Sequence, residues 1–577
     1  MTAQAGRLEA DIKARSYAYR KSRDQDAAGL ARHPVVVIGA GPVGLATAID
    51  LAQGGIPVLL IDDDNTLSVG SRAICFAKRT LEIFDRLGCG QRMVEKGVIW
   101  QTGKVFFQDK PIYEFDLLPD AGYRRPAFIN LQQYYAEAFL LDRAAELPNL
   151  EIRWKNRLIG LEQNDDGATL AIETPDGAYR MQADWLVACD GSRSAARQLL
   201  GLESKGNVFK DRFLIADIKM SAAFPPERWF WFDPPFHRGQ SVLLHKQPDD
   251  VWRIDFQLGW DADPVAEKQP ERVIPRVKAL LGEEAEFSLE WVSVYTFACM
   301  RMDSFRHGRV LFAGDAAHGV SPFGARGANS GIQDAENLAW KLRFVMQGLA
   351  PERLLDSYDA ERVHAADENI LNSTRSTDFI TPKNRASMAF RNATLELARD
   401  FLFARRIVNS GRLSVPAVLH NSPLNTPDAD AFAGPLRPGA VAADAPIRES
   451  AGRQGGEEAW LLDKLGGRFA LLIFVDAAGD SRLPSEDEIA DIEKLVGPVS
   501  LLLIAARHEA NGQLDANIQG PSTARIVQDS AGFAAKRYDA KPGSVYLLRP
   551  DQHICARFRA FDPQAIRAAL LRATGNV

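Results

Sequence analysis

The 577-residue chain is too long for one ordinary hydrophobic core, so we expect two or three domains. Its hydrophobic content of 46%, charged content of 25% and formal net charge of −6 are typical of a soluble globular protein and leave no basic footprint for nucleic acid. The five cysteines are scattered, without a CxxC pair or the spacing of metal ligands. We therefore expect a reduced, cytoplasmic protein with no metal site.

The amino-terminal part of the chain carries no membrane signal. Residues 1–33 form a polar extension that has no apolar core, so we do not expect a secretory signal. The longest apolar stretch, residues 34–52, is interrupted by Pro42 and by glycines, which excludes a membrane span.

Residues 34–64, PVVVIGAGPVGLATAIDLAQGGIPVLLIDDD, predict a strand, a glycine turn, a helix and a second strand. Gly39 and Gly41 let the backbone turn tightly and approach a pyrophosphate, and Gly44 lets the helix pack close to the strand. The amino end of that helix favours phosphate groups. Asp62 follows the second strand, where a carboxylate accepts hydrogen bonds from ribose. The pattern predicts dinucleotide binding and leaves NAD and FAD open.

A second stretch, GRVLFAGDAAHGVSPFGARGANSGIQDAENLAWKL at residues 308–342, favours FAD. It predicts a buried strand that ends at Asp315, then a glycine-rich loop and an amphipathic helix. A flavin dinucleotide has a ribityl chain with free hydroxyls, and Asp315 is placed to accept from one. Small residues at the helix start leave backbone N–H groups bare for the negative charge of a reduced flavin. The apolar stripe of the helix has a helical period: Ile332, Ala335, Ala339, Leu342 and Met346.

With these motifs the chain resembles the single-component FAD-dependent aromatic hydroxylases, which include p-hydroxybenzoate, phenol and 3-(3-hydroxyphenyl)propionate hydroxylases. The resemblance covers about residues 35–375 and includes a third motif, DWLVACDGSRSAAR at residues 184–197. The loop GARGAN departs from the commoner GxGxN form by carrying Arg326. The glycine pattern and the resemblance together give these expected FAD-binding residues: Gly39, Gly41, Pro42, Gly44, Asp62, Arg72, Gln133, Asp190, Gly191, Gly314, Asp315, Pro322, Gly327 and Asn329.

The expected fold class is α/β, with a Rossmann-type FAD-binding domain and an inserted antiparallel substrate sheet. We place the FAD-binding domain at residues 34–205 and 307–420, and the substrate sheet at residues 206–306, with a hairpin near 104–130. A Pro- and Gly-rich linker at 421–446 precedes an α/β domain at 447–577. The resemblance to the phenol hydroxylase branch implies a thioredoxin-like fold there. Its only cysteine is Cys555, so we expect no thiol exchange.

The resemblance implies an NAD(P)H:oxygen monooxygenase that hydroxylates a small phenolic compound ortho or para to its hydroxyl. The reductant would be NADH or NADPH, the oxygen would pass through a flavin hydroperoxide, and we expect a homodimer. A base that withdraws the phenol proton makes the ring more nucleophilic. The sequence identifies no single base, and we expect His318 to be a structural hydrogen-bonding residue. Candidates on the inserted sheet are His237, His245, Arg253, Asp255 and Tyr295.

Other proteins of related fold remain as alternatives. The GWxWxIP signature of flavin halogenases is missing, and Cys75 has no partner closer than Cys89, which disfavours a disulfide reductase. A Baeyer–Villiger or polyketide-tailoring flavin monooxygenase is the main enzymatic alternative. A binding protein that escorts a prenylated partner and has lost the flavin is the other alternative. It predicts colourless protein, whereas a hydroxylase purifies yellow.

Overall fold

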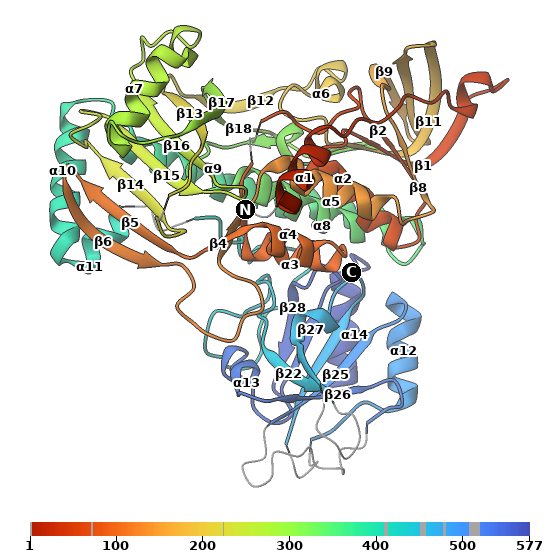
Figure 1. Cartoon of the computed structure of the whole chain (residues 1–577). Coiled ribbons are helices and arrows are strands. Elements are labelled where there is room, and N and C mark those ends of the chain that lie inside the picture. Colours follow the sequence, from red (N-terminus) through yellow and green to blue (C-terminus); the bar gives the residue numbers. More distant parts are fainter. Residues whose placement is uncertain are drawn as a thin grey trace.

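A computed structural model describes the chain over residues 3–70, 73–222, 224–408, 413–449, 457–476, 481–506 and 520–577. In Figure 1 an upper body contains two large sheets, and a separate α/β body formed by the carboxyl-terminal part of the chain (blue) lies below it. Within the described residues, no helix is long and apolar enough to cross a membrane.

The first sheet contains the predicted glycine motif. Its order is β19-β20-β11-β1-β2-β8, with β10 and then β9 continuing from β11. Strands β20, β11, β1, β2 and β8 run parallel, which confirms the predicted Rossmann-type α/β fold. Their bounds are β1 (Ala31–Ile38), β2 (Val58–Ile61), β8 (Leu150–Arg153), β9 (Arg157–Asn164), β10 (Gly167–Thr174), β11 (Gly177–Ala188), β19 (Arg306–His307) and β20 (Val310–Phe312).

Four long helices pack beside this sheet: α2 (Pro42–Gln53), α5 (Gln133–Ala144), α8 (Gly327–Met346) and α9 (Leu354–Ile380). Helices α2 and α8 carry the two glycine-rich motifs at their amino ends, and they pack against each other. The predicted stripe of α8 faces the core: Ile332, Ala335, Ala339 and Leu342 are at most 1% exposed, and Met346 is partly buried. The structure thus brings the two motifs, far apart in sequence, to one place.

The second sheet is the inserted one, with the order β17-β13-β16-β15-β14-β5-β6. The hairpin β5–β6 joins the sheet at the β14 edge. Strand β5 runs parallel to β14, whereas all other strand pairs of this sheet are antiparallel. The predicted antiparallel inserted sheet is confirmed, and the predicted hairpin is added to it through one parallel pair. A hairpin fixes only the directions of its own two strands, and β5 enters the sheet from elsewhere in the chain.

The bounds of this sheet are β5 (Thr102–Phe107), β6 (Lys110–Asp116), β13 (Arg212–Lys219), β14 (Arg228–Phe232), β15 (Ser241–Lys246), β16 (Val251–Leu258) and β17 (Ser288–Tyr295). Figure 1 shows α7 (Pro270–Leu281) near one end of it and α10 (Arg385–Asp400) and α11 (Leu402–Ile407) at the far edge of the molecule. Shorter elements connect the two sheets: β3 (Cys75–Ala77), α3 (Lys78–Arg86), α4 (Gly90–Lys96), β4 (Val98–Trp100), β7 (Phe128–Asn130), α6 (Ala195–Leu199), β12 (Ser204–Val208), β18 (Ala298–Met302) and β21 (His318–Gly319).

The carboxyl-terminal body is a third sheet, with the order β23-β22-β26-β25-β24-β27-β28 and apolar clusters on both faces. Strands β24, β25 and β26 are parallel, and β27 and β28 are antiparallel to their neighbours. The thioredoxin-like assignment stays a prediction. The bounds are β22 (Pro446–Glu449), β23 (Glu458–Trp460), β24 (Ala470–Val475), α12 (Glu486–Val496), β25 (Ser500–Ala506), β26 (Arg525–Asp529), α13 (Phe533–Arg537), β27 (Val545–Leu548), β28 (Ile554–Phe558) and α14 (Pro563–Ala573).

Two segments that we expected outside the cores are packed in the structure. The amino-terminal extension forms α1 (Ala3–Lys13) and the 3-10 turn η1 (Arg23–Asp26). The expected linker contains no helix or strand from residue 421 to residue 445, yet Leu424 is only 2% exposed. Both segments therefore contribute to the folded body.

Candidate active site

The first glycine turn has the geometry that a bound pyrophosphate requires. Gly39 has φ +100°, and a Cβ there would lie 2.5 Å from the carbonyl oxygen of Cys189. A Cβ on Gly44 would lie 1.9 Å from the oxygen of Gly39, so only glycine allows α2 to pack this closely on the turn. A Cβ on Gly41 would meet nothing within 4 Å. That open space lies at the start of α2, where Pro42 is the first helical residue.

Asp62 follows β2 and lies against the same turn. Its Oδ2 accepts a hydrogen bond from the Ala40 N–H at 2.5 Å, and its Oδ1 accepts one from the Asp64 N–H at 2.8 Å. Burial raises the pKa of the Asp62 carboxyl, although these N–H donors oppose the shift. The carboxylate is thus fixed beside the glycine turn, in the position predicted for ribose recognition.

The Asp315 motif is held in place by a buried neighbour that sequence reasoning missed. Asp315 is exposed in a 3-10 turn after β20, whereas Asp334 on α8 is fully buried. Asp334 accepts from the Gly314 N–H at 3.0 Å and from Arg362 at 2.6 Å, and its Oδ2 lies 2.6 Å from His318 Nε2. Burial raises the pKa of Asp334, but the charges of His318 and Arg362 outweigh it and hold that pKa below its usual value.

Asp334 therefore anchors the turn that presents Asp315. The prediction that His318 is a structural hydrogen-bonding residue agrees with its short contact to Asp334. The apolar stripe of α8 gave no signal for Asp334, which lies off the stripe at 3.6 residues per turn. It is buried because α8 is covered on nearly all sides, and a buried acid needs partners.

At the start of α8 part of the backbone is accessible, whereas the Asn329 side chain makes several hydrogen bonds. Pro322 is exposed and Gly327 is partly buried. Asn329 is 1% exposed, and its amide accepts from the Ala77 N–H and the Thr80 hydroxyl and donates to the Cys75 carbonyl. The Asn329 side chain thus joins α8 to β3 and α3. Any role of Asn329 toward a cofactor is left to its backbone N–H.

The third motif leaves another open position. Gly191 has φ +76°, and a Cβ there would meet nothing within 4 Å. Asp190 Oδ2 accepts from the Ala196 N–H at 3.0 Å, while Asp190 Oδ1 is buried and has no hydrogen-bond partner among the described residues. A buried carboxylate oxygen without a partner is the kind of group that a ligand satisfies.

Arg72 lies outside the described residues, but both sides of it can be placed. On one side, Gly70 packs so closely on the Trp291 ring that a Cβ would lie 2.4 Å from Trp291 Cε2. On the other, the Ala73 N–H donates to Gln133 Oε1 at 3.1 Å. Gln133 in turn donates to Glu137 at 2.8 Å. Gln133 therefore fixes the segment that follows Arg72.

The inserted sheet carries a row of polar side chains on one face, and two of them contact Cys75 of β3. We name this group the inner-face cluster; its members are Arg228, His245, Arg253, Asp255 and Tyr295, from strands β14, β15, β16 and β17. The strand register pairs His245 with Arg253, and residues at alternate positions along each strand share a face. Four of the five expected candidates therefore meet, and Arg228 is the member that the sequence analysis missed. Its signal was a cation at an inward position of an alternating aromatic strand, RWFWF.

The inner-face cluster is incompletely paired. Arg253 makes two 2.7 Å hydrogen bonds to Asp217, so its charge is compensated. Arg228 is 8% exposed and has no carboxylate within 4 Å in the part of the chain that the structure describes. Within the same residues, Asp255 Oδ1 and His245 Nε2 are buried without hydrogen-bond partners.

Burial sets the protonation of this cluster. It raises the pKa of Asp255 to about 6, even though Arg253 and Arg228 oppose the shift. Burial also lowers the pKa of His245 well below its usual value and raises that of Tyr295 well above it. At neutral pH the cluster therefore holds a carboxylate that titrates near neutrality, a neutral imidazole and a phenol. Such perturbed groups in one place are typical of functional sites.

Cys75 connects the inner-face cluster to the predicted flavin region. Its Sγ lies 3.8 Å from Arg228 Nη1 and 3.9 Å from His245 Nδ1, and its carbonyl accepts from Asn329 at the start of α8. The cluster thus lies beside the amino end of α8. His237 is elsewhere: its Nε2 lies 2.7 Å from the Gln257 carbonyl oxygen and its ring packs edge-on against Phe256, on the opposite face of the sheet.

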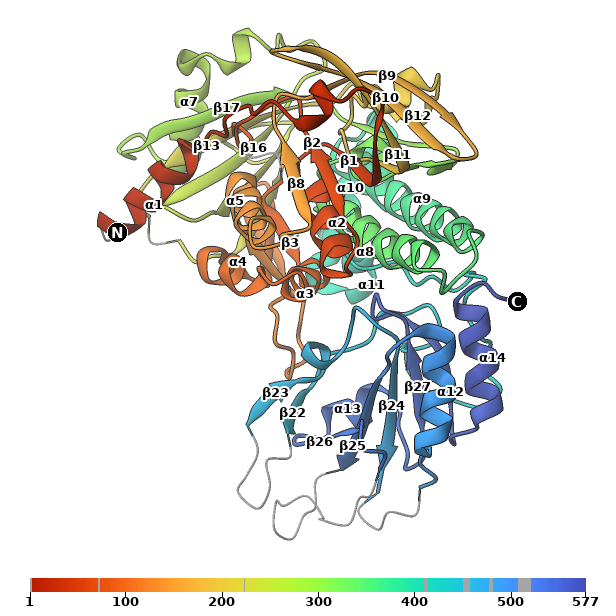
Figure 2. The ribbon, with the colours of Figure 1, turned by 90° about the vertical axis from the view of Figure 1, so that its right-hand side faces the viewer.

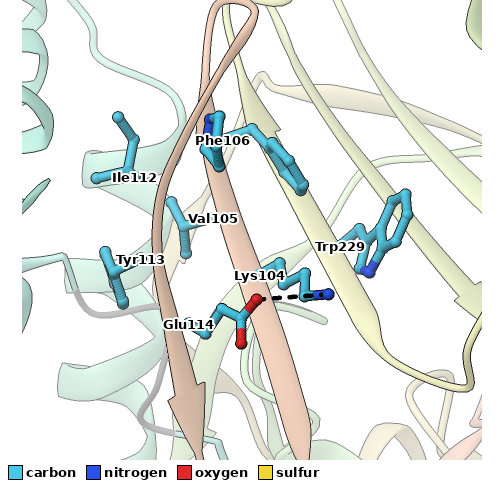
Figure 3. Close-up of a pocket in the computed structure, with 8 residues that line it drawn as sticks. Lys104, Val105, Phe106, Ile112, Tyr113, Glu114 and Trp229 are labelled. Atoms are coloured by element: carbon cyan, nitrogen blue, oxygen red, sulfur yellow. Dashed lines mark ion pairs between the residues drawn. The ribbon is translucent and has the colours of Figure 1, made fainter.

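A cavity of about 300 Å³ lies elsewhere, at the β5–β6 edge of the inserted sheet (Figure 3). Lys104 lines it and pairs with Glu227 at 2.9 Å and with Glu114 at 3.4 Å. It shares no residue with the inner-face cluster and is no candidate for the chemistry. The described residues contain no group of three or more His, Cys, Asp and Glu side chains that could hold a metal ion.

Comparison with known proteins agrees with this geometry. Residues 32–373 match the model of a family described as "FAD binding domain". The chain belongs to this family. It is 29% identical over 520 residues to the 3-(3-hydroxy-phenyl)propionate/3-hydroxycinnamic acid hydroxylase of Mycolicibacterium smegmatis, an alignment that covers 90% of this chain and 89% of that protein. The predicted membership of the FAD-dependent aromatic hydroxylases is confirmed.

Two further matches extend the comparison. The probable NADH-specific resorcinol 4-hydroxylase of Rhodococcus jostii is 33% identical over 339 residues, which are 57% of this chain and 62% of that protein. The crystal structure of the flavin-dependent monooxygenase PieE with FAD and substrate superposes with a TM-score of 0.74 at 22% identity. It covers 94% of this chain and 99% of PieE, and shows that the fold is shared over nearly the whole length.

Proposed function

We propose that this flavoprotein monooxygenase hydroxylates a small phenolic compound ortho or para to its hydroxyl, with molecular oxygen and NADH or NADPH as co-substrates. The observation that carries the proposal is the buried Asp255 carboxyl, which has an unpartnered oxygen among the described residues and a pKa near 6, beside Tyr295 and Arg228. The names of the relatives, hydroxyphenylpropionate and resorcinol hydroxylases, support a phenolic substrate. The name of the second supports NADH as reductant.

The residues present fit FAD. The open space at Gly41 and the start of α2 would take the pyrophosphate, Asp62 the adenosine ribose and Asp315 the ribityl chain. The amino end of α8 at Gly327 would face the flavin ring. When bound and reduced, FAD supplies the activated oxygen that the aromatic ring receives.

The inner-face cluster would prepare the aromatic ring for that oxygen. Asp255 Oδ1 accepts the proton of the phenol hydroxyl, and Arg228 stabilises the phenolate that develops next to it. Tyr295 stays protonated because its pKa is raised, so its hydroxyl donates a hydrogen bond to the phenolate oxygen. The His245 imidazole stays neutral at neutral pH because its pKa is lowered, so it adds no positive charge beside the phenolate.

Aromatic side chains beside the cluster would keep water out. Phe213, Phe297 and Phe323 are at most 8% exposed and pack against one another, with Tyr295 next to Phe213 and Phe297. A dry site strengthens the charge interactions of Asp255 and Arg228 and prevents loss of the activated oxygen as hydrogen peroxide.

The test is turnover with a panel of phenols and phenolic acids. Anaerobic stopped-flow reduction by NADH and NADPH should be slow without substrate and at least about tenfold faster with the right phenol, a fall of ~1.4 kcal/mol in the barrier. The product should carry one atom of labelled oxygen on the ring, ortho or para to the hydroxyl. A lactone or ester product indicates Baeyer–Villiger chemistry instead. Colourless protein that binds no FAD indicates the cofactor-free binding protein.

We also propose that the protein is a homodimer that uses the surface of α10 and α11. This surface exposes large apolar side chains: Met388 (40%), Phe390 (58%), Leu397 (43%), Phe401 (50%), Leu402 (71%), Phe403 (59%) and Ile407 (43%). An interface with a two-fold axis places the same patch of both protomers face to face, so the apolar side chains of one copy would cover those of the other.

Sedimentation of the wild type and of Leu402→Asp tests the dimer. The variant should become monomeric, because a charge at the centre of an apolar interface is strongly unfavourable. A wild-type monomer at micromolar concentration would contradict the proposal. The five cysteines are all free and buried, which supports the proposal of a reducing, cytoplasmic location.

A further inference from the structure

The amino-terminal extension connects the two sheets. We name residues 9–26 the N-terminal strap; they precede the region that matches the family model, which begins at residue 32. Figure 2 shows this segment (red) running from α1, beside β13 and β17, across the molecule toward β1 and β8. Its contacts along this path explain what it holds.

The first part of the strap is anchored on the inserted sheet. Glu9 is 7% exposed and lies 3.5 Å from Lys219 of β13, while Lys13 lies 3.8 Å from Glu290 of β17. Glu9 and Lys13 also pair with each other at 2.6 Å. Ile12 is 1% exposed and belongs to the core of the first sheet. The strap is therefore packed into the molecule at its start.

The second anchor is α5, the helix that begins with Gln133. Arg15 pairs with Asp142 of α5 at 2.7 Å, and Lys13 lies over the Tyr134 ring, 5.4 Å from its centroid. These contacts bring the strap across α5 to the carboxyl end of β2.

The third anchor is the loop that follows Asp62. The Tyr17 N–H donates to the Asn65 carbonyl at 2.8 Å, and Asn65 Nδ2 donates to the Tyr17 carbonyl at 2.9 Å. The adjacent residues, Ser16 and Thr66, form an isolated β-bridge. The Tyr17 ring stacks on Trp154, with 4.6 Å between centroids and 15° between planes. The strap thus pairs with this loop through the backbone and a side-chain amide, and the Tyr17 ring fixes it on Trp154, just after β8.

The far end of the strap is fixed as well. Asp24 Oδ2 lies 2.6 Å from Arg153 at the end of β8 and 2.7 Å from His33 Nε2 on β1. Because Tyr17 lies between the two anchored ends of the strap, the strap contacts the loop from a fixed position. Residues 63–66 are themselves exposed or only partly buried, and they are held by the strap on one side and by the Lys155 N–H, which donates to the Asp64 carbonyl at 3.2 Å, on the other.

We propose that the N-terminal strap holds the loop after β2 so that Asp62 keeps its place for the adenosine ribose of FAD, with Tyr17 and Asn65 as positioning residues. The connection runs from Tyr17 to Asn65, to its neighbour Asp64, whose N–H donates to Asp62 Oδ1 at 2.8 Å. Loss of the strap contacts frees this loop and lowers the affinity for FAD. The inference rests on the proposed function only in that FAD is the cofactor.

The test is the dissociation constant of FAD, measured with the full-length apoprotein by quenching of flavin fluorescence, without turnover. Asn65→Ala removes the amide hydrogen bond to the Tyr17 carbonyl, and Tyr17→Ala removes the ring that fixes this part of the strap on Trp154; each should raise the constant about tenfold, which corresponds to ~1.4 kcal/mol. Tyr17→Phe keeps the ring on Trp154 and leaves Arg15 paired with Asp142, so it should bind like the wild type. Lys21→Ala is the matched control, because Lys21 lies in the strap and, among the described residues, pairs only with the exposed Asp26.

A double-mutant cycle separates positioning from general loosening. If the strap acts through Asp62, Tyr17→Ala should add little to the loss caused by Asp62→Ala, whereas independent effects would multiply. Asn65→Ala should show the same dependence on Asp62. Unchanged FAD affinity in Tyr17→Ala, or full multiplication in the cycle, overturns the proposal. A wild-type apoprotein that binds no FAD would instead overturn the proposed function.

Discussion

Two buried groups of charged side chains in this chain differ in how completely they are paired. The first joins the carboxyl-terminal body to the upper one, and we name it the interdomain cluster: Asn337 and Lys341 of α8, Glu361 of α9, and Arg549 and Asp551 between β27 and β28. Lys341 lies 2.7 Å from Glu361, and Arg549 lies 2.5 Å from both Glu361 and Asp551. The side chains of these four charged residues are 0% exposed.

The inner-face cluster is the opposite case. Asp255 and His245 each keep a buried atom without a partner among the described residues, and Arg228 has no carboxylate within 4 Å there. Buried polar groups are expensive unless they are hydrogen-bonded. The complete cluster therefore stabilises the joint between the two bodies, and the incomplete cluster is one that a bound substrate completes. The difference in pairing separates a structural group from a functional one.

The largest expected effect is on the interdomain cluster. Glu361→Gln leaves Lys341 and Arg549 buried with less negative charge between them, and should lower the free energy of unfolding by about 3–5 kcal/mol. Denaturant unfolding measures the loss. The matched control is Glu352→Gln, because this exposed residue pairs with Arg306 at the surface, where such pairs contribute little. Equal stability of the two variants would mean that the interdomain cluster is not structural.

Asp255→Asn addresses the inner-face cluster. Loss of a general base should lower kcat by about 10²–10⁴-fold. The free energy of unfolding should not fall, because the variant removes a buried carboxylate that lacks a full set of partners. Asp261→Asn, an exposed residue in the loop after β16, is the control and should leave kcat unchanged. A variant that keeps full kcat but unfolds more easily would make Asp255 structural.

The pH dependence tests the same residue. The pKa of Asp255 is about 6 in the folded protein, against roughly 4 for an unfolded aspartate. The folded state therefore binds the Asp255 proton more tightly than the unfolded state does. The stabilisation that this gives is present below pH ~4 and is lost as the pH rises to ~6. The difference between wild type and Asp255→Asn isolates this contribution. Catalysis needs the unprotonated form, so kcat should rise through pH ~6.

The cofactor motifs could be predicted because their residues lie close together in the sequence. The two buried clusters could not, because their members come from distant parts of the chain. Gly39, Gly44 and Asp62 lie within one strand–helix–strand unit, so their positions follow from the sequence. The partners Glu361 and Arg549 are 188 residues apart, and no period along the chain relates them. Arg228 could be predicted to point inward from the alternation of its strand. The absence of a carboxylate near Arg228 among the described residues could not be predicted, because it depends on which strands the fold places beside β14.

An intermediate effect is expected for Asp315→Ala, which removes a carboxylate outside both clusters. Loss of a hydrogen bond to the ribityl chain should cost roughly 1–3 kcal/mol, or about one to two decades in FAD affinity. Residual flavin after extensive dialysis, read from the absorbance spectrum, measures the loss. The free energy of unfolding of the apoprotein, measured for the same variant, separates weaker FAD binding from a loosened turn. Full flavin occupancy after dialysis would remove Asp315 from the site.

The smallest effect is expected at Cys555, the cysteine of the carboxyl-terminal domain. Its thiol is 0% exposed in the core of the carboxyl-terminal sheet, and Sγ lies 3.4 Å from the Leu547 carbonyl. Burial raises the pKa of the thiol to about 12, so almost no thiolate exists at neutral pH. Thiol exchange needs a thiolate, and no second cysteine lies in this domain. Cys555→Ser, whose hydroxyl can donate to the same carbonyl, should therefore leave turnover unchanged. Loss of hydroxylation in a folded, FAD-bound variant would give this domain a redox role. Complete pairing would then no longer separate a structural region from a functional one.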